Sequence, residues 1–393
     1  MFNAESMITE RLKGIDASGI RKVFDLAAKL KDPINLSIGQ PDFDVPDEVK
    51  AAAAKAISDG MNSYTQTQGI ADLRDKVSLL IGHEFPNTLG NGQGGLSDDT
   101  GVLITSGVSG GLMLALLATV QPGDEVLIPD PYFVMYKHLV TLAGGKAVYV
   151  DTYPDFQLTV EKLEACVTEK TKVVLFNTPS NPTGVVATSD ACKAVAEWCE
   201  AKGLLLLSDE IYDEFCYEKV VGNDDEMRCA SPASYSKNLL LMRGYSKTYA
   251  MTGWRLGYVV GPKAIVEQMT KLQQYSFVCA PSMVQFGGVA AMDIDMSSYV
   301  EAYTKKRDMV VEKLSGTFEL TKPGGAFYAF PKVPEGLGMT ATQFVEKVIE
   351  RNVLVIPGNV FSQRDTHFRI SYACSNDKLA AGLDVLVDVA KQG

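Results

Sequence analysis

Short apolar runs alternate with amphipathic stretches along the chain from about residue 100 onward. The runs predict buried strands, and the stretches between them, such as 189–203, predict helices. Strands that read as continuous apolar runs and alternate with helices indicate a mostly parallel sheet covered on both faces. We therefore expect an α/β fold with a doubly wound sheet. Its strands are expected at 101–107, 124–130, 146–152, 172–178, 204–210, 238–244 and 256–261.

The pattern changes after about residue 285. A long helix is predicted over 297–316, and strands follow at 326–333, 353–358 and 367–373, before a closing helix. With 393 residues, the chain also exceeds the roughly 250–300 residues that a single core usually supports. We expect a large domain over 45–290 and a smaller α+β domain that combines 1–44 with 291–393.

Composition narrows the range of partners. The net charge of −11 argues against a broad surface for nucleic acid or for an anionic membrane. Seven cysteines without a CxxC pair, and only three histidines, do not predict a metal site and suit reduced thiols in a cytoplasmic protein. The N-terminal residues have neither a basic start nor an apolar run, so we expect no signal peptide. The longest apolar stretches are too short to span a bilayer.

The first candidate for ligand chemistry is the turn from a strand into a helix at Ser106, Gly107 and Val108. Small residues there let backbone N–H groups approach an anion, and the helix dipole favours negative charge. A purely structural turn explains the same sequence, since glycine is common in such turns. The segment matches neither GxGxxG nor a Walker loop, so a dinucleotide or nucleoside triphosphate is not expected.

Other unusual residues also follow strands, where ligands bind in doubly wound sheets. Phe133 offers an aromatic face for stacking, although a core role would suit it too. Asn181 lies in the turn-rich "TPSNPTG", and turn chemistry is its plainer explanation. Asp209 ends a run of four leucines and needs a cation or several donors unless it caps a helix. Tyr212 follows it closely and offers a phenol.

The segment "GYSKTYAMTGWRLGY" supplies an amine and a guanidinium among apolar and aromatic neighbours. Lys247 can form an imine with an aldehyde if burial and nearby cations lower its pKa. Arg255 suits a phosphate, which its fork can hold with paired hydrogen bonds. An amine, a phosphate cradle, a stacking ring, a carboxylate and two groups for a phenolic oxygen together indicate one cofactor, pyridoxal 5′-phosphate (PLP).

The chain resembles the class I/II aminotransferases of the fold-type I PLP family over essentially its whole length. The resemblance is carried by "GQPDFDVP", "NSYTQTQGIADLR", "PGDEVLIPDPYF", "NTPSNPTG", "SDEIY", "YSKTYAMTGWRLGY", "PGGAFYAFP" and "HFRISYACS". It implies that Lys247 binds PLP covalently and that Asp209 pairs with the ring nitrogen. It also implies that Phe133 stacks on the ring while Asn181 and Tyr212 hold the 3-oxygen. Lys247, Asp209 and Tyr212 are the implied catalytic residues.

The resemblance also implies how the phosphate is bound. Ser106, Gly107 and Val108 would supply backbone donors, and Arg255 a guanidinium. Tyr64 would reach the phosphate from the partner subunit, which implies a homodimer with shared active sites.

Arg369 resembles the residue that binds the substrate α-carboxylate, with Gly39 as a backbone donor and Asn181 close to the same group. Many relatives carry a hydroxyl residue three positions before the lysine, where this chain has Gly244. Ser246 is the candidate that replaces it at the phosphate.

The expected substrate follows from two cationic residues of acid-specific relatives that this sequence lacks. Some acid-specific relatives carry a lysine where this chain has Val108, and others an arginine near 272–273, where it has Leu and Gln. The segment 16–30 resembles broad or aromatic aminotransferases. We therefore expect an aromatic or apolar L-amino acid as donor and a 2-oxo acid such as 2-oxoglutarate as acceptor. Lys271 leaves an acidic substrate open.

Other activities stay open on the same scaffold. Aspartate or alanine aminotransferase activity is the main alternative. A PLP-dependent C–S β-lyase or cyclopropane-forming synthase is a second, since one fold hosts many reactions. An effector-sensing domain of a regulator is not favoured, because no room for a DNA-binding module precedes "SIGQPDF".

Overall fold

The computed structural model describes residues 2–16, 19, 30–222 and 226–392. Its centre is a seven-stranded sheet in the order β2-β10-β9-β6-β5-β3-β4. Neighbouring strands are parallel except at β10, which runs antiparallel to β2 and β9. The strands are β2 (Thr100–Thr105), β3 (Glu125–Asp130), β4 (Lys146–Asp151), β5 (Thr171–Asn177), β6 (Leu205–Asp209), β9 (Leu239–Gly244) and β10 (Gly257–Pro262). The predicted α/β class with a mostly parallel sheet is confirmed.

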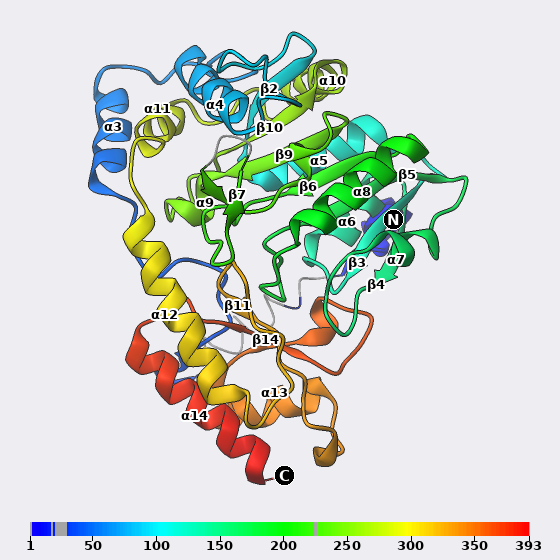
Figure 1. Cartoon of the computed structure of the whole chain (residues 1–393), viewed down its shortest axis with the longest axis vertical. Helices are drawn as coiled ribbons and strands as arrows, with labels where there is room; N and C mark the ends of the chain where they lie inside the picture. The colour runs from blue at the N-terminus through cyan, green and yellow to red at the C-terminus, as the bar shows by residue number, and fades with distance from the viewer. Residues whose placement is uncertain (1, 17–18, 20–29, 223–225, 393) are drawn as a thin grey trace.

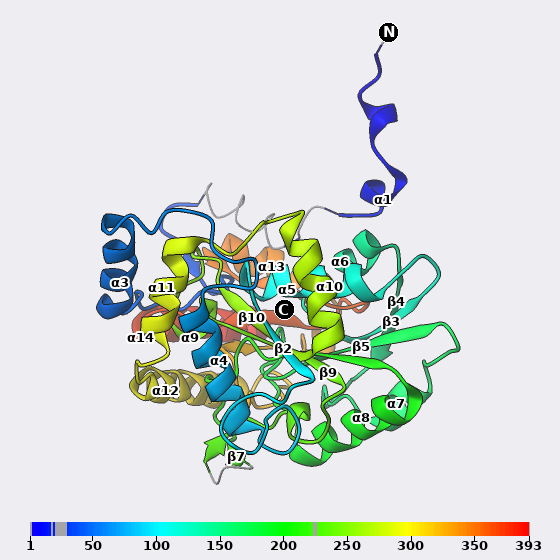
Figure 2. The ribbon, with the colours of Figure 1, turned by 90° about the horizontal axis from the view of Figure 1, so that it is seen from above.

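Both faces of this sheet are apolar, because successive side chains of a strand point to opposite sides. Leu206 and Leu207 show the division, since each belongs to a different buried cluster. Helices cover both faces (Figures 1 and 2). One face packs against α3 (Asp47–Ser58), α4 (Ala71–Glu84), α7 (Val160–Glu164), α8 (Ser189–Lys202) and α11 (Ser282–Ala291). The other packs against α5 (Gly107–Thr119), α6 (Met135–Ala143) and α10 (Lys263–Gln274).

A second assembly lies beyond the carboxyl ends of the parallel strands (Figure 1). Its core joins Leu36 to apolar residues between 303 and 389, and it also includes Tyr212 and Phe215 from the segment after β6. Helices α12 and α14 lie side by side along its outer face. Its elements are β1 (Ile34–Asn35), α12 (Ser297–Leu314), β11 (Tyr328–Ala329), α13 (Ala341–Glu350), β12 (Val353–Leu354), β13 (Ile356–Pro357), β14 (Phe368–Ser371) and α14 (Asn376–Gln392).

The N-terminal segment enters this assembly, because β1 pairs in parallel with β12. The domain boundaries at residues 44 and 290 stay a prediction. Two of the predicted strands are interrupted. The strand expected over 326–333 is only β11, since Pro331 has no N–H to continue a ladder. The apolar run 353–358 is divided between β12, which pairs with β1, and β13, which pairs with β14.

The remaining short elements are α1 (Glu10–Lys13), β7 (Val220–Val221), β8 (Met227–Arg228) and α9 (Tyr245–Thr248). Figure 2 shows α1 and the residues before it extending away from the body of the molecule. Of the segment 16–30, all but 16, 19 and 30 lie outside the described residues. Within the described ranges, every helix is too short or too polar to cross a membrane. All seven cysteines are free thiols.

Candidate active site

A cavity of about 270 Å³ lies where the ends of β5, β6 and β9 meet the second assembly. Residues near the central sheet and residues of the second assembly both line this cavity. The lining residues are Gly39, Val108, Ser109, Leu112, Phe133, Tyr136, Asn177, Asn181, Asp209, Ile211, Tyr212, Ser246, Lys247, Thr252, Arg255, Tyr328 and Arg369.

Lys247 lies on the short helix α9, which begins directly after β9. Its Nζ donates a hydrogen bond to the carbonyl oxygen of Gly39 at 2.6 Å. Burial, followed by the guanidiniums of Arg369 and Arg255, lowers the pKa of Lys247 to about 8. The amine is therefore more readily deprotonated than an exposed lysine, which a nucleophile requires.

Asp209 ends β6 and is held from two sides. Tyr136 donates its hydroxyl to Oδ2 at 2.7 Å, and the backbone N–H of Ile211 donates to Oδ1 at 3.3 Å. Burial raises the pKa of Asp209 to about 6, while the hydrogen bond from Tyr136 opposes that rise. Tyr136 was missed by the sequence analysis. Its only sequence signal is its position in α6, three residues after Phe133.

The start of α5 and Arg255 together form a corner whose groups are suited to binding an anion. Gly107 has a φ of +70°, and a Cβ at this position would lie 2.5 Å from Nη2 of Arg255. The guanidinium therefore rests against bare backbone at the helix N-terminus. Arg255 itself has a φ of +58°, a strained conformation of the kind found at functional sites. Its Nη1 donates to the carbonyl of Thr252 at 2.9 Å.

Arg369, on β14, is only 1% exposed. Its Nη1 donates to Oδ1 of Asn181 at 3.0 Å and its Nη2 to the carbonyl of Ser37 at 2.7 Å. Its Nε finds no hydrogen-bond partner among the described residues. The rings of Tyr328 and Phe361 lie 4.6 and 4.5 Å from the guanidinium carbon. A guanidinium fixed in this way can bind a carboxylate with little further ordering.

Tyr212 carries another phenol of the cavity. Its hydroxyl lies 2.9 Å from the hydroxyl of Tyr328. Phe133 lies on the same cavity wall, with its ring 5.7 Å from that of Tyr136 and nearly perpendicular to it.

The structure brings most of the predicted site residues together. Those that line the cavity are Gly39, Val108, Phe133, Asn181, Asp209, Tyr212, Ser246, Lys247, Arg255 and Arg369. Ser106 and Gly107 form the adjoining start of α5. Tyr64 does not line the cavity and is 85% exposed. The individual roles stay predictions.

Gly244 explains one departure from the family pattern. A Cβ there would lie 3.1 Å from the Cα of Gly257 and the carbonyl of Leu256 on the neighbouring strand. The chain therefore has little room for a hydroxyl residue at this position. Ser246 is buried and lines the cavity.

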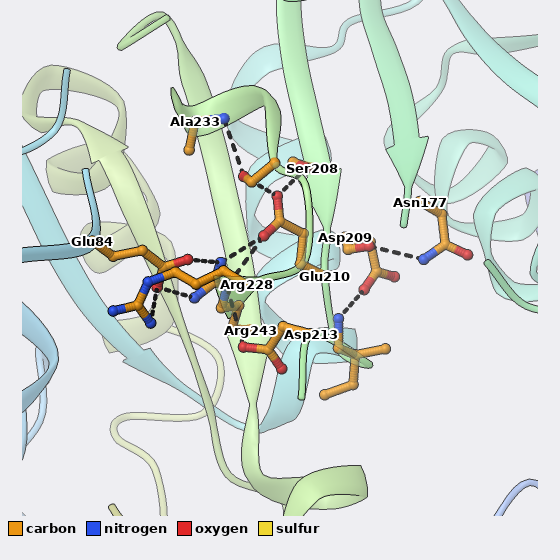
Figure 3. A network of polar contacts seen from close by, with 11 residues as sticks. Glu84, Asn177, Ser208, Asp209, Glu210, Asp213, Arg228, Ala233 and Arg243 are labelled. Atoms are coloured by element: carbon orange, nitrogen blue, oxygen red, sulfur yellow. Dashed lines mark hydrogen bonds and ion pairs between the residues drawn. The ribbon is translucent and has the colours of Figure 1, made fainter. Parts of the chain in front are cut away.

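A buried ion-pair cluster, which the sequence analysis also missed, lies behind the site (Figure 3). Arg243, four residues before Lys247, donates to Glu84 through Nη1 and Nη2 at 2.7 and 2.8 Å. It also donates to Glu210 through Nε and Nη2 at 3.1 and 2.9 Å. Glu210 follows Asp209 directly, so the cluster ties the end of β6 to the end of β9. Glu84 is the last residue of α4.

Asp213 completes the cluster, with Oδ2 3.3 Å from Nε of Arg243. Burial raises the pKa of Asp213 to about 8, against the opposing effect of Arg243. Glu210 is held further by the hydroxyls of Ser208 and Ser231 at 2.7 and 2.6 Å. Glu84 and Glu210 thus each accept hydrogen bonds from Arg243, and Glu210 also accepts from two hydroxyls, as buried charges require.

Comparison with known proteins identifies a family that this chain resembles. The family model "Aminotransferase class I and II" matches residues 31–386. A "Probable aspartate aminotransferase" of Methanocaldococcus jannaschii is 36% identical, over 98% of this chain and 100% of that protein. The "Aromatic-amino-acid aminotransferase 2" of Thermococcus litoralis is also 36% identical, over 98% of each chain.

A solved structure has the same architecture. The aspartate aminotransferase of Thermotoga maritima superposes with a TM-score of 0.87 at 30% identity, covering 97% of this chain and 99% of that one. The similarity therefore extends over both assemblies of the fold.

Proposed function

This chain belongs to the aminotransferase class I and II family, and on that premise we propose that it moves the amino group of an aromatic or other apolar L-amino acid to a 2-oxo acid such as 2-oxoglutarate. Members of this family are PLP-dependent transaminases. One observation carries the proposal: Lys247, Asp209 and Arg369 line the same cavity, so an amine, a carboxylate and a guanidinium are available to one small ligand.

The residues present fit PLP. The anion-binding corner at Gly107 and Arg255 suits its phosphate, because the missing Cβ leaves the backbone N–H groups accessible next to a guanidinium. Lys247 would hold its aldehyde carbon and Asp209 its ring nitrogen. Phe133 would stack on the ring. Asn181 uses its Oδ1 for Arg369, which leaves Nδ2 as the donor for the 3-oxygen beside Tyr212.

When bound, PLP supplies an aldehyde and an electron-accepting ring on which the amino group is exchanged. Lys247 would take the proton from the substrate Cα as a general base and give it to C4′ of the cofactor as a general acid. Its lowered pKa, about 8, is close to the value that this double role requires. Asp209 would keep a proton on the ring nitrogen through an ion pair, and the hydrogen bond from Tyr136 orients the carboxylate for that task.

Substrate orientation is assigned to Arg369. Its guanidinium would bind the α-carboxylate with Asn181 and the backbone of Gly39 beside it. Among the described residues that line the cavity, the only cations are Lys247, Arg255 and Arg369. Each already has a task, so an apolar side chain suits the donor better than a second carboxylate. Lys271 does not line the cavity, and its Nζ donates to Gln268.

Aspartate is the second candidate donor. The observation that favours it is that two relatives, 36% and 34% identical to this chain, are named "Probable aspartate aminotransferase" and "Aspartate aminotransferase". The free thiols suit a reducing compartment, and we include a cytoplasmic location in the proposal.

We also propose a homodimer with shared active sites. Large apolar side chains are exposed at Met61, Tyr64, Tyr275 and Phe277. The two segments that carry them are connected, because Nε2 of Gln273 donates to the carbonyl of Thr67 at 2.7 Å. Exposed apolar surface of this kind indicates a protein interface.

The absorption spectrum of the purified, PLP-supplied protein tests the proposal. Adding L-tyrosine should replace the PLP band with that of pyridoxamine phosphate, and L-aspartate in a parallel cell should do so poorly. Conversion by aspartate alone would leave the aminotransferase assignment in place and overturn the substrate assignment. Release of ammonia and pyruvate without an oxo acid would instead indicate a lyase. Absence of any PLP band would overturn the assigned site.

A further inference from the structure

Tyr328 joins two groups with different proposed tasks. Its hydroxyl lies 2.9 Å from that of Tyr212, which is proposed to hold the cofactor 3-oxygen. Its ring lies 4.6 Å from the guanidinium carbon of Arg369, which is proposed to bind the substrate carboxylate. Tyr328 is 1% exposed and lines the cavity. The sequence analysis gave it no role.

The strand pairing explains why Tyr328 reaches both groups. In the antiparallel pair of β11 and β14, Tyr328 lies opposite Ser371 and diagonal to Arg369. Diagonal positions two residues apart share one face of a sheet, so both side chains point towards the cavity. A Cβ on Gly39 would lie 2.3 Å from the Tyr328 hydroxyl oxygen, so the phenol occupies the space beside bare backbone.

The hydrogen bond between the two phenols has one direction that is compatible with cofactor binding. Each hydroxyl has a single proton. If Tyr212 donates its proton to the 3-oxygen, its own oxygen must accept from Tyr328. Burial raises the pKa of both hydroxyls, so both keep their protons at neutral pH. An accepted hydrogen bond polarises a hydroxyl and makes it a stronger donor.

We propose that Tyr328 is a positioning residue that acts on the cofactor through Tyr212 and on the substrate through Arg369. Its hydroxyl strengthens the hydrogen bond from Tyr212 to the 3-oxygen. Its ring, together with that of Phe361, holds the guanidinium by cation–π contact. The inference rests on the proposed function, because both contacts matter only if PLP and an amino acid occupy the cavity.

Two substitutions separate the hydroxyl from the ring. Tyr328→Phe removes the hydroxyl and keeps the ring over Arg369. In the PLP-loaded protein it should raise the pH at which the visible cofactor band changes by about 0.5 unit, because a weakened donor stabilises the anionic oxygen less. The KM for the amino-acid donor should stay within about twofold. Tyr328→Leu removes the ring as well and should raise that KM by about fivefold or more.

A double-mutant cycle identifies the route of the effect. Tyr328→Phe should shift the band midpoint much less in a Tyr212→Phe background, because the phenol through which it acts has been removed. Tyr153→Phe is the matched control. It also removes one hydrogen bond between side chains of the two assemblies, to Ser362 at 3.0 Å, but lies outside the cavity. It should leave the midpoint unchanged.

The outcomes separate this inference from the proposed function. A wild-type protein with no titrating PLP band would overturn both. A wild-type band whose midpoint is the same in Tyr328→Phe would overturn the hydroxyl role while leaving the aminotransferase proposal intact. Equal shifts in Tyr328→Phe and Tyr153→Phe, or full additivity with Tyr212→Phe, would also overturn it, because a general loss of packing would then explain the change.

Discussion

Lys247 donates a hydrogen bond to the backbone carbonyl of Gly39 across 208 positions of sequence. The amine that follows β9 is therefore held against the N-terminal segment that leads into the second assembly. Its hydrogen-bond partner is a neutral carbonyl, and the charges that affect its pKa most are the cations Arg369 and Arg255. Burial, followed by these two cations, favours the neutral form of the amine.

Lys247→Ala should abolish turnover while part of the PLP stays bound. The phosphate corner, Asp209 and Phe133 remain in this variant, but the covalent link and the base that acts at Cα are lost. Transamination rate and PLP content, measured on the same sample, check this. Lys193→Ala, which alters an exposed lysine of α8, is the control and should behave as wild type. Turnover close to wild type in Lys247→Ala would contradict the assignment.

The rate of covalent PLP attachment to cofactor-free protein should depend on the pKa of Lys247. Only the neutral amine reacts, so the rate should rise with pH and level off above the folded-state pKa of about 8. Between pH 7 and 9 the neutral fraction grows by roughly tenfold for such a group. Stopped-flow absorption measures the rate. A rise that continues unchanged beyond pH 10 would indicate an ordinary exposed lysine.

Arg369→Gln should raise the KM for amino-acid donors by roughly 10- to 100-fold, because a charged hydrogen-bonding partner of the carboxylate is lost. PLP content should change little. Arg364→Gln is a matched control on the same segment, since Arg364 pairs with Asp151 away from the cavity. Steady-state kinetics of both variants measure the KM for amino-acid donors. An unchanged KM in Arg369→Gln would remove the carboxylate role.

Arg243→Met should destabilise the fold by about 3–5 kcal/mol, because Glu84 and Glu210 would be left buried without their cation. Denaturant unfolding of the cofactor-free protein measures the loss. Adding Glu84→Gln should cost less than the sum of the single changes, since the two residues share one interaction. Strict additivity would show that the pair is not coupled.

Mixing Tyr64→Ala with Lys247→Ala subunits tests the shared site. If Tyr64 acts across a dimer, each mixed dimer regains one site with an intact Lys247 and the partner's intact tyrosine. Activity should then reappear on mixing two poorly active proteins under conditions that exchange subunits. No recovery, with mixed dimers shown by mass spectrometry, would place Tyr64 in its own subunit's site or outside any site.

Much of the fold could be predicted because it rests on local periodicity. Apolar runs such as 172–178 and 204–210 became the central parallel strands, and the residues that follow them came together at one edge of the sheet. Prediction was weaker where a proline or a change of partner interrupts a run, as at β11 and at the division between β12 and β13.

The residues that sequence reasoning missed are joined by contacts that no local pattern records. Tyr328 and Tyr212 are 116 positions apart, and Arg243 and Glu84 are 159 apart. Tyr136 is an ordinary aromatic residue of an amphipathic helix until the fold places its hydroxyl on Asp209. Such residues acquire their roles only from the partner that packing brings to them.

The sequence by itself determined the α/β class and the residue types at the strand ends, because burial repeats with the period of each element and turns use characteristic residues. Only the tertiary structure decided which of these groups share a cavity, how deeply each is buried and which partner it meets. Those three conditions set the pKa values of Lys247 and Asp209 and the fixed plane of Arg369. Desolvation and charge interaction depend on distances between chain segments, and the order of residues alone does not contain those distances.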